Sequence, residues 1–178
     1  METFEHTAPP FPSNESRYEL LAVAARGFHP PQAVRVVETA VDSKADEFPG
    51  LRRTWSVLYR QIAETAPLLQ RPYAIYLLGV NPPDDASDAE LATFNDFYTD
   101  VHLVEVAERR HALRAVRYEL IEEVEAPYLG APRFLAAYEV DETSASHRRH
   151  VGPPYSSGPA VWQRHTTPWR LWYRHLGS

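Results

Sequence analysis

The stretch TFNDFYTDVHLVEV, residues 93–106, decides the fold of this chain. At about 100° per residue Phe94, Phe97, Tyr98, Val101 and Val104 fall within about 120° of one another, which predicts an amphipathic helix with one face toward a core. A polar row borders that face at spacings of three, four and three, and it consists of Asn95, Tyr98, His102 and Glu105. Side chains at these spacings reach one another along a helix. Since solubility alone would place polar groups opposite the core, this row indicates the lining of a pocket.

The composition indicates a folded domain with a substantial core. The chain has 178 residues, of which 44% are hydrophobic and 12% aromatic, enough for one large domain. It contains no cysteine, which excludes disulfides, thiolate catalysis and thiolate metal sites. The formal net charge of −6 argues against a nucleic-acid partner, because that affinity depends on neutralising phosphates.

Neither a membrane span nor a signal peptide is predicted. No run approaches the roughly 18 apolar residues that a membrane helix requires. Residues 1–16 are polar and proline-rich, and they lack the basic start and apolar centre of a secretory signal. We therefore expect a cytoplasmic protein without membrane contact, in which residues 1–16 are disordered or extended.

Residues 72–178 predict one α+β domain. Their patterns favour a strand at 73–80, a helix from Ser87 or Asp88 to about Arg109, strands at 113–124 and 134–140, a short helix at 142–150 and a strand at 168–176. This β-α-β-β-α-β order is the split β-α-β arrangement of a ferredoxin-like fold.

Residues 17–71 predict a β-α-β extension, with strands at 17–25 and 54–62 and a helix at 33–41. The extension resembles half of the following domain. Residues 55–62 and 169–176 share the pattern W-x-[VL]-x-Y-R-x-[IL]. Two aromatic strands can also share such a pattern by chance, so both duplication and coincidence stay open.

Residues 73–176 resemble the dimeric α+β barrel superfamily, in particular its EthD-like members. The apolar strand YAIYLLGV, the helix FNDFYTDVHL and the closing aromatic strand around WYR carry the resemblance. It implies an antiparallel sheet with helices on one face, a pocket between them, and pairing of two sheets in a homodimer. By this resemblance His102 matches the helix histidine that some members use as an acid or base, which is an analogy of fold.

The resemblance implies a cofactor-independent enzyme of secondary metabolism that acts on an aromatic or polyketide-like metabolite. The expected chemistry is proton transfer in a cyclisation, dehydration, decarboxylation or isomerisation. The alternatives are a cofactor-free monooxygenase of the same fold and a non-catalytic protein that binds a small hydrophobic molecule. No phosphate-binding loop or serine-hydrolase elbow occurs, and no motif favours heme, so we expect no cofactor.

His102 is the main catalytic candidate, because an imidazole both takes and returns a proton near neutral pH. Tyr98 and Asn95 are the expected donors to a developing enolate oxygen. A structural role for His102, as a helix residue that bonds a neighbour, is the competing interpretation. The expected substrate-binding residues are Glu105, Tyr76, Tyr118, Trp169 and Tyr173, since aromatic strands can line a cavity for a planar ligand. An ordinary aromatic core explains the strand residues equally simply.

His147 and His150 flank two arginines at a spacing that can chelate a metal on a helix. The arginines would repel a cation, and no carboxylate follows nearby. We therefore expect no metal site, and a solvated loop or a cationic lid here.

Overall fold

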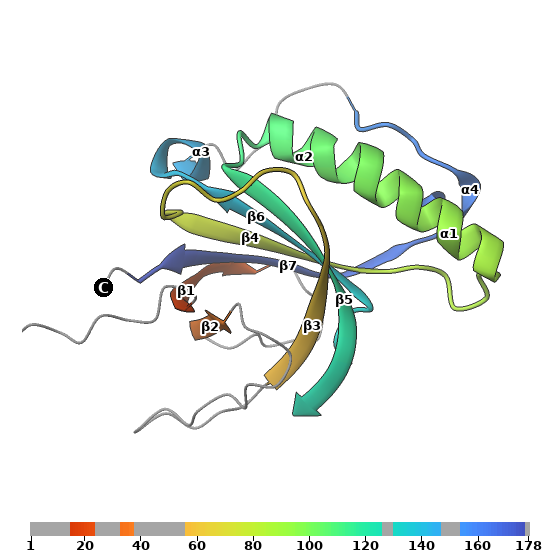
Figure 1. Ribbon diagram of the computed structural model, residues 1–178, viewed down its shortest axis with the longest axis horizontal. Helices are drawn as coiled ribbons and strands as arrows, with labels where there is room; N and C mark the ends of the chain where they lie inside the picture. Colours follow the sequence, from red (N-terminus) through yellow and green to blue (C-terminus); the bar gives the residue numbers. More distant parts are fainter. Residues whose placement is uncertain (1–14, 24–32, 38–55, 126–129, 147–153, 177–178) are drawn as a thin grey trace, which may run out of the picture.

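The computed structural model describes residues 15–23, 33–37, 56–125, 130–146 and 154–176 (Figure 1). They form antiparallel strands and helices, which makes this an α+β fold. The strands are β1 (Glu15–Val23), β2 (Ala33–Val37), β3 (Ser56–Glu64), β4 (Ala74–Asn81), β5 (Arg114–Glu125), β6 (Phe134–Val140) and β7 (Thr166–His175). The helices are α1 (Asp88–Phe97), α2 (Leu103–Arg109), α3 (Glu142–Ser146) and α4 (Ala160–Gln163), and a π-helical turn, η1 (Tyr98–His102), joins α1 to α2.

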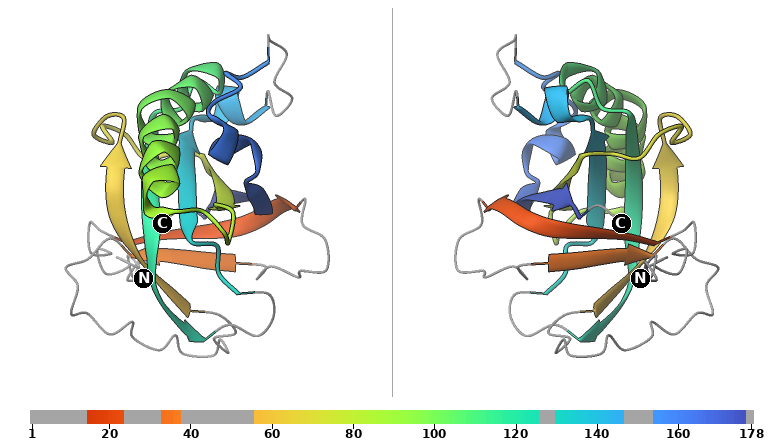
Figure 2. Two further views of the ribbon diagram at one scale, coloured as in Figure 1. Left: turned by 90° about the vertical axis from the view of Figure 1, so that its right-hand side faces the viewer. Right: turned by 90° about the vertical axis from the view of Figure 1, so that its left-hand side faces the viewer.

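The described strands form one sheet in the order β2-β1-β7-β4-β6-β5-β3, and all neighbours are antiparallel. β4 lies in the middle, as its almost wholly apolar sequence requires, and all but its last residue are buried. We call β7, β4, β6 and β5 the inner strands. β1 pairs with β7 at one side of them, and β3 pairs with β5 at the other. Figure 2 shows the strong twist of the sheet, in which β1 and β2 run across the direction of β5 and β3.

Strand register aligns side chains across the helix-covered face of the sheet. Tyr76 on β4 lies opposite Tyr138 on β6 and opposite Trp172 on β7. In the next row on this face, Leu78 lies opposite Ala136 and Arg170, and Ala136 in turn lies opposite Arg117 on β5. Residues two apart along a strand share a face, so an aromatic row runs beside a row with an arginine at each end.

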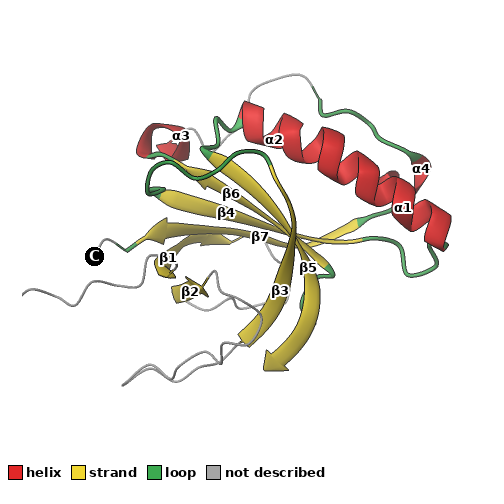
Figure 3. Cartoon of the chain, viewed as in Figure 1, coloured by secondary structure: helices red, strands yellow, loops and turns green. Residues whose placement is uncertain are grey.

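The helix over this face is a single rod, residues 88–109, interrupted in its hydrogen bonding by η1 (Figure 3). Ser87 caps its start: the Ser87 hydroxyl accepts from the Glu90 N–H, while the Glu90 carboxylate accepts from the Ser87 N–H. In η1 the Leu103 N–H donates to the Tyr98 carbonyl, five residues back. Such π-turns are frequent at functional sites.

Both faces of the inner sheet are buried. The larger core lies between the sheet and the helices, and it includes Tyr76, Tyr138 and Trp172 from the strands. The smaller core lies on the opposite face and consists of Ile75, Leu77, Ala137, Trp169, Leu171 and Tyr173. Trp169 and Tyr173 thus share a face, as their spacing predicts, and Trp172 belongs to the other.

The sequence patterns locate most elements correctly and one of them wrongly. The strands and the long helix predicted in residues 72–178 are confirmed within a few residues at their ends, and so are the strands expected at 17–25 and 54–62. The helix expected at 33–41 is wrong, because 33–37 form β2 and pair with β1; residues 38–41 lie outside the described residues. Three valines in AVRVV favour a strand, and valine spacing alone misled the helix prediction. Helix α4 is not predicted.

Two further expectations concern the ends and surroundings of the domain. Residues 15 and 16, expected to be disordered or extended, already belong to β1, and 1–14 lie outside the described residues. β1 and β3 do not pair with each other, and the duplication of 17–71 stays a prediction. None of the helices in the described ranges has the length and apolar character needed to cross a membrane.

Gly79 on β4 is expected to tolerate no side chain. A Cβ placed there would lie 2.6 Å from Pro132 Cγ and 3.1 Å from Trp169 Cβ, in a buried position. We expect Gly79→Ala to lower the free energy of unfolding by about 1–3 kcal/mol in urea denaturation, through overpacking. Gly130→Ala is the control, because a Cβ at Gly130 meets nothing closer than a Glu123 carboxylate oxygen at 3.5 Å. Equal stability of the two variants would contradict the tight packing.

Candidate functional site

The floor of the candidate site is the aromatic row on the helix-covered face of the sheet. The ring of Tyr76 stacks on Trp172 with centroids 5.0 Å apart and on Tyr138 with centroids 6.0 Å apart. All three side chains are buried, and Tyr138 is wholly inaccessible. Cross-strand aromatic pairs of this kind stabilise a sheet and present a flat surface to the layer above.

The roof of the site is η1, which contributes Tyr98 and His102. Tyr98 is completely buried, and its ring lies 5.7 Å from that of His102 in an edge-to-face arrangement. The spacing of four residues on the helical rod brings the two side chains together, as the sequence predicts. We call Tyr76, Tyr98, His102 and Tyr138 the tyrosine–histidine cluster.

The segment 154–163 encloses His102 from the remaining side. The rings of Trp162 and Tyr155 lie 4.6 Å and 5.4 Å from the imidazole. Gly158 takes a φ of +67°, and a Cβ there would lie 2.6 Å from Phe97 and from Trp162, so the segment packs closely at this glycine. These contacts surround the imidazole with aromatic rings.

Polar contacts on the surface hold the outer part of this segment. The Glu105 carboxylate accepts hydrogen bonds from the Ser156 backbone N–H, at 3.1 Å, and from its hydroxyl. Arg109 donates to the Pro154 carbonyl and lies 4.3 Å above the Tyr155 ring. Exposed charged contacts contribute little stability each, so residues 154–157 can separate from α2 at low cost.

Several polar atoms at the cluster are buried without a protein partner. Among the described residues, nothing hydrogen-bonds the hydroxyls of Tyr98 and Tyr138, the His102 Nδ1 or the Arg110 Nε. Buried polar atoms in folded proteins nearly always have a partner, and each exception requires an explanation. A ligand that supplies donors and acceptors to these atoms provides one.

Burial fixes the protonation states of the cluster. Burial, together with the neighbouring charges of His165 and Arg109, lowers the pKa of His102 to about 4, while Glu105 opposes the change. Burial also raises the pKa of Tyr76, of Tyr98 and of Tyr138 above the ordinary tyrosine range. At neutral pH the imidazole is therefore an uncharged acceptor, and the phenols keep their protons and donate.

Arg117 on β5 joins the helical rod to the sheet. Its guanidinium donates to the Asn95 carbonyl at 3.2 Å, to the Asn95 side-chain oxygen and to the Thr99 hydroxyl at 2.7 Å. Its charged end also lies over the rings of Tyr98 and Phe134, at 4.3 and 4.4 Å. Only 1% of this residue is exposed, and burial lowers its pKa to about 10, so it is still a cation at neutral pH.

The structure divides the sequence-predicted site residues into three groups. His102, Tyr98 and Tyr76 lie together in the cluster. Asn95 and Glu105 point elsewhere: Asn95 binds Arg117, and Glu105 binds Ser156. The other expected binding residues, Trp169 and Tyr173 with the partly buried Tyr118, lie on the opposite face of the sheet, so the structure does not bring them to the cluster.

Sequence reasoning missed the residues that complete the site. They are Arg110, Arg117, Tyr155 and Trp162, and the expected binding set also left out Tyr138. Alternation along 134–140 could have signalled Tyr138, since Phe134, Ala136 and Tyr138 share a face. Arg110 and Tyr155 give no such signal, because one ends a helix and the other lies in a loop.

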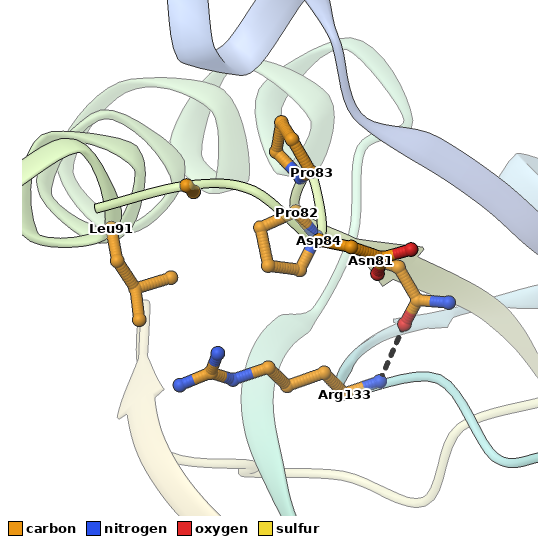
Figure 4. Close-up of a pocket in the computed structure, with 7 residues that line it drawn as sticks. Asn81, Pro82, Pro83, Asp84, Leu91 and Arg133 are labelled. Carbon is orange, nitrogen blue, oxygen red and sulfur yellow. Dashed lines mark hydrogen bonds between the residues drawn. The ribbon is translucent and has the colours of Figure 1, made fainter. Parts of the chain in front are cut away.

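Two hollows open on the surface away from the cluster. One, of about 220 Å³, lies beside the turn after β4, where Arg133 extends below Leu91 and its backbone N–H donates to Asn81 (Figure 4). The other, of about 380 Å³, lies near His175 and Asp141. Neither is lined by a predicted site residue. Within the described ranges, no three His, Asp or Glu side chains gather where they could hold a metal ion, and His147 and His150 lie outside these ranges.

Asn95 is expected to act through stability. Asn95→Ala removes the acceptor of a buried guanidinium N–H, and we expect it to lower the free energy of unfolding by about 1–3 kcal/mol. Asp96→Ala, an exposed position on the same helix, should change it by no more than about 0.5 kcal/mol. Urea denaturation compares the two variants, and equal stability would show that the Asn95–Arg117 contact does not anchor the helix.

The chain was also compared with known proteins. It matches no family model, no curated protein and no solved structure. We therefore base the functional proposal on the residues of this chain and on the geometry of the tyrosine–histidine cluster.

Proposed function

We propose that the chain is a cofactor-independent enzyme that transfers a proton on an aromatic or polyketide-like metabolite, at the tyrosine–histidine cluster. One observation carries the proposal: an uncharged imidazole lies beside the phenol of Tyr98 between a π-turn and the sheet, and their buried polar atoms, like the Tyr138 hydroxyl, have no partner among the described residues. A general base next to hydrogen-bond donors is the arrangement that enolate chemistry needs.

The strand order supports the fold that this proposal implies. The inner strands run β7-β4-β6-β5, with the helical rod connecting β4 to β5. We propose that this part is ferredoxin-like and of the dimeric α+β barrel type, in which the space between sheet and helix holds the ligand. The cluster occupies that space.

The proposed reaction begins at a carbon next to a carbonyl group. His102 takes the proton from this carbon, the electron pair of the C–H bond forms a carbon–carbon double bond, and the π pair of the carbonyl group moves to its oxygen. Tyr98 or Tyr138 donates a hydrogen bond to the enolate that forms. Asn95 is placed at Arg117 instead, where its side-chain oxygen accepts from the guanidinium.

The protonated His102 then returns the proton. Delivery to another carbon completes an isomerisation, and delivery to a leaving hydroxyl completes a dehydration. In a cyclisation the enolate carbon first attacks a second carbonyl carbon of the substrate, and the proton goes to the alkoxide oxygen that this bond formation leaves. The low pKa of His102 makes it a weak base in the free protein, but the negative charge of an adjacent enolate favours the imidazolium. The aromatic rings around it exclude water and hold the substrate.

The substrate enters, in this proposal, where Tyr155 covers His102. That cover is held by the exposed contacts of Glu105 and Arg109, whereas Gly158 and Trp162 pack tightly. Separation of residues 154–157 from α2 would open the cluster without disturbing the rest of the core.

The test is a comparison of metabolites in the native host. Extracts of a gene deletion are profiled by mass spectrometry beside strains restored with wild type, His102→Ala or His111→Asn. We expect an intermediate to accumulate in the deletion and with His102→Ala, and to disappear with wild type and with His111→Asn. His111 is the control because it is exposed and has a positive φ of 50°, which asparagine tolerates.

The outcomes separate the proposal from its alternatives. Full rescue by His102→Ala, or identical profiles in all strains, would overturn the acid–base role and favour a non-catalytic binding protein. A product heavier by one oxygen atom, with oxygen uptake by the purified protein, would instead identify a cofactor-free monooxygenase.

A further inference from the structure

Three arginines surround the tyrosine–histidine cluster. Arg117 and Arg170 stand at the two ends of the row next to the aromatic floor, as the strand register fixes. Arg110, at the end of α2, lies 4.1 Å above the Tyr76 ring and 5.4 Å from the Trp172 ring. The charges of these arginines act on the cluster tyrosines: Arg110 and Arg170 on Tyr76, Arg117 on Tyr98, and Arg110 on Tyr138.

The carboxylates nearest to the cluster are already engaged. Glu105 accepts from Ser156, and its charge reaches His102. The charge of Glu119 acts on Arg117, but its carboxylate forms an ion pair with Arg60 at 2.7 Å. Glu139 is on the opposite face of the sheet, where it forms a buried ion pair with Arg114 at 2.6 Å. In the described part of the chain, no carboxylate forms an ion pair with Arg110 or Arg117.

Arg110 is the arginine best placed to meet a ligand. It is partly buried, and its side chain makes no hydrogen bond or ion pair with the described residues. The N–H groups of a guanidinium lie in its own plane. When its face covers an aromatic ring, these groups point past the edge of the ring and can donate to an oxyanion. Arg117, by contrast, donates to Asn95 and Thr99 and contributes mainly its charge.

We propose that the cluster binds its ligand as an anion: a planar aromatic or enolic molecule whose carboxylate, phenolate or enolate oxygen faces Arg110. This inference rests on the site of the proposed function and names the class of its substrate. The aromatic rings receive the planar part, and the ligand supplies the negative charge that no carboxylate of the described residues brings to Arg110. A bidentate contact between guanidinium and carboxylate is strong in such surroundings.

The test compares two probes of the same shape, one an anionic carboxylate and the other an uncharged amide. 2-Naphthoate and 2-naphthamide have the same ring, and isothermal titration calorimetry measures their affinities for the full chain at pH 7. We expect 2-naphthoate to bind at least about tenfold more tightly, as one well-placed charged contact provides. Equal affinities, or no binding of 2-naphthoate at millimolar concentration, would overturn the inference.

Variants assign the preference to Arg110. We expect Arg110→Met, which keeps an unbranched apolar stem but has no charge, to abolish the preference for 2-naphthoate, and Arg110→Lys to retain part of it. Arg133→Met is the control, since Arg133 is an exposed arginine at the hollow beside the turn after β4. Thermal denaturation confirms that each variant is folded. A folded Arg110→Met protein that keeps the full preference for 2-naphthoate would contradict the proposal. Loss of this preference in Arg133→Met would contradict it as well.

The two proposals can fail separately. If Arg110→Met loses the preference but His102→Ala restores the metabolite profile, the anion site stands and the enzyme proposal falls. If the profile depends on His102 while wild type binds both probes equally, the enzyme proposal stands and the anionic substrate is excluded.

Discussion

The burial of Arg117 is the constraint on which the rest of the site depends. A guanidinium removed from water must find hydrogen-bond acceptors and aromatic faces, because an uncompensated buried charge is costly. Asn95, Thr99 and the Tyr98 ring supply them from the helical rod, and Phe134 supplies a ring from the sheet. These contacts fix the rod over the sheet. They place the Tyr98 ring against the Arg117 guanidinium, and His102 follows one helical turn later.

Strand register then determines what His102 and Tyr98 face. Tyr76 lies between Trp172 and Tyr138 on neighbouring strands, so the sheet presents aromatic rings with hydroxyl groups beneath η1. Trp162 and Tyr155 close the remaining side. This packing buries much of the imidazole, keeps it uncharged at neutral pH and leaves polar atoms without partners among the described residues. The interactions that stabilise the core therefore also prepare the chemistry.

Sequence alone could predict the inner strands and the long helix, because their hydrophobic periods and the Ser87–Glu90 capping box are local signals. It could also place His102 beside Tyr98, which depends only on helical spacing. It could not predict that Asn95 binds Arg117, since the partner lies 22 residues away on a strand. Nor could it decide which faces of β4 and β7 lie under the helices. The structure shows that Tyr76 is on the helix-covered face and that Trp169 and Tyr173 are on the opposite face. β2 was mistaken for a helix because Val34, Val37 and Val41 follow helical spacing, although Val34 and Val36 also follow the alternation of a strand.

The charge state of His102 is the central claim, and NMR titration of its imidazole in the full chain measures it most directly. Comparison with His102→Gln assigns the ring signal. The account predicts a midpoint near pH 4 and an uncharged ring at pH 7, because burial among aromatic side chains disfavours the imidazolium. A midpoint near the ordinary histidine value of about 6.5 would show that the ring is hydrated in solution and would contradict the enclosed site.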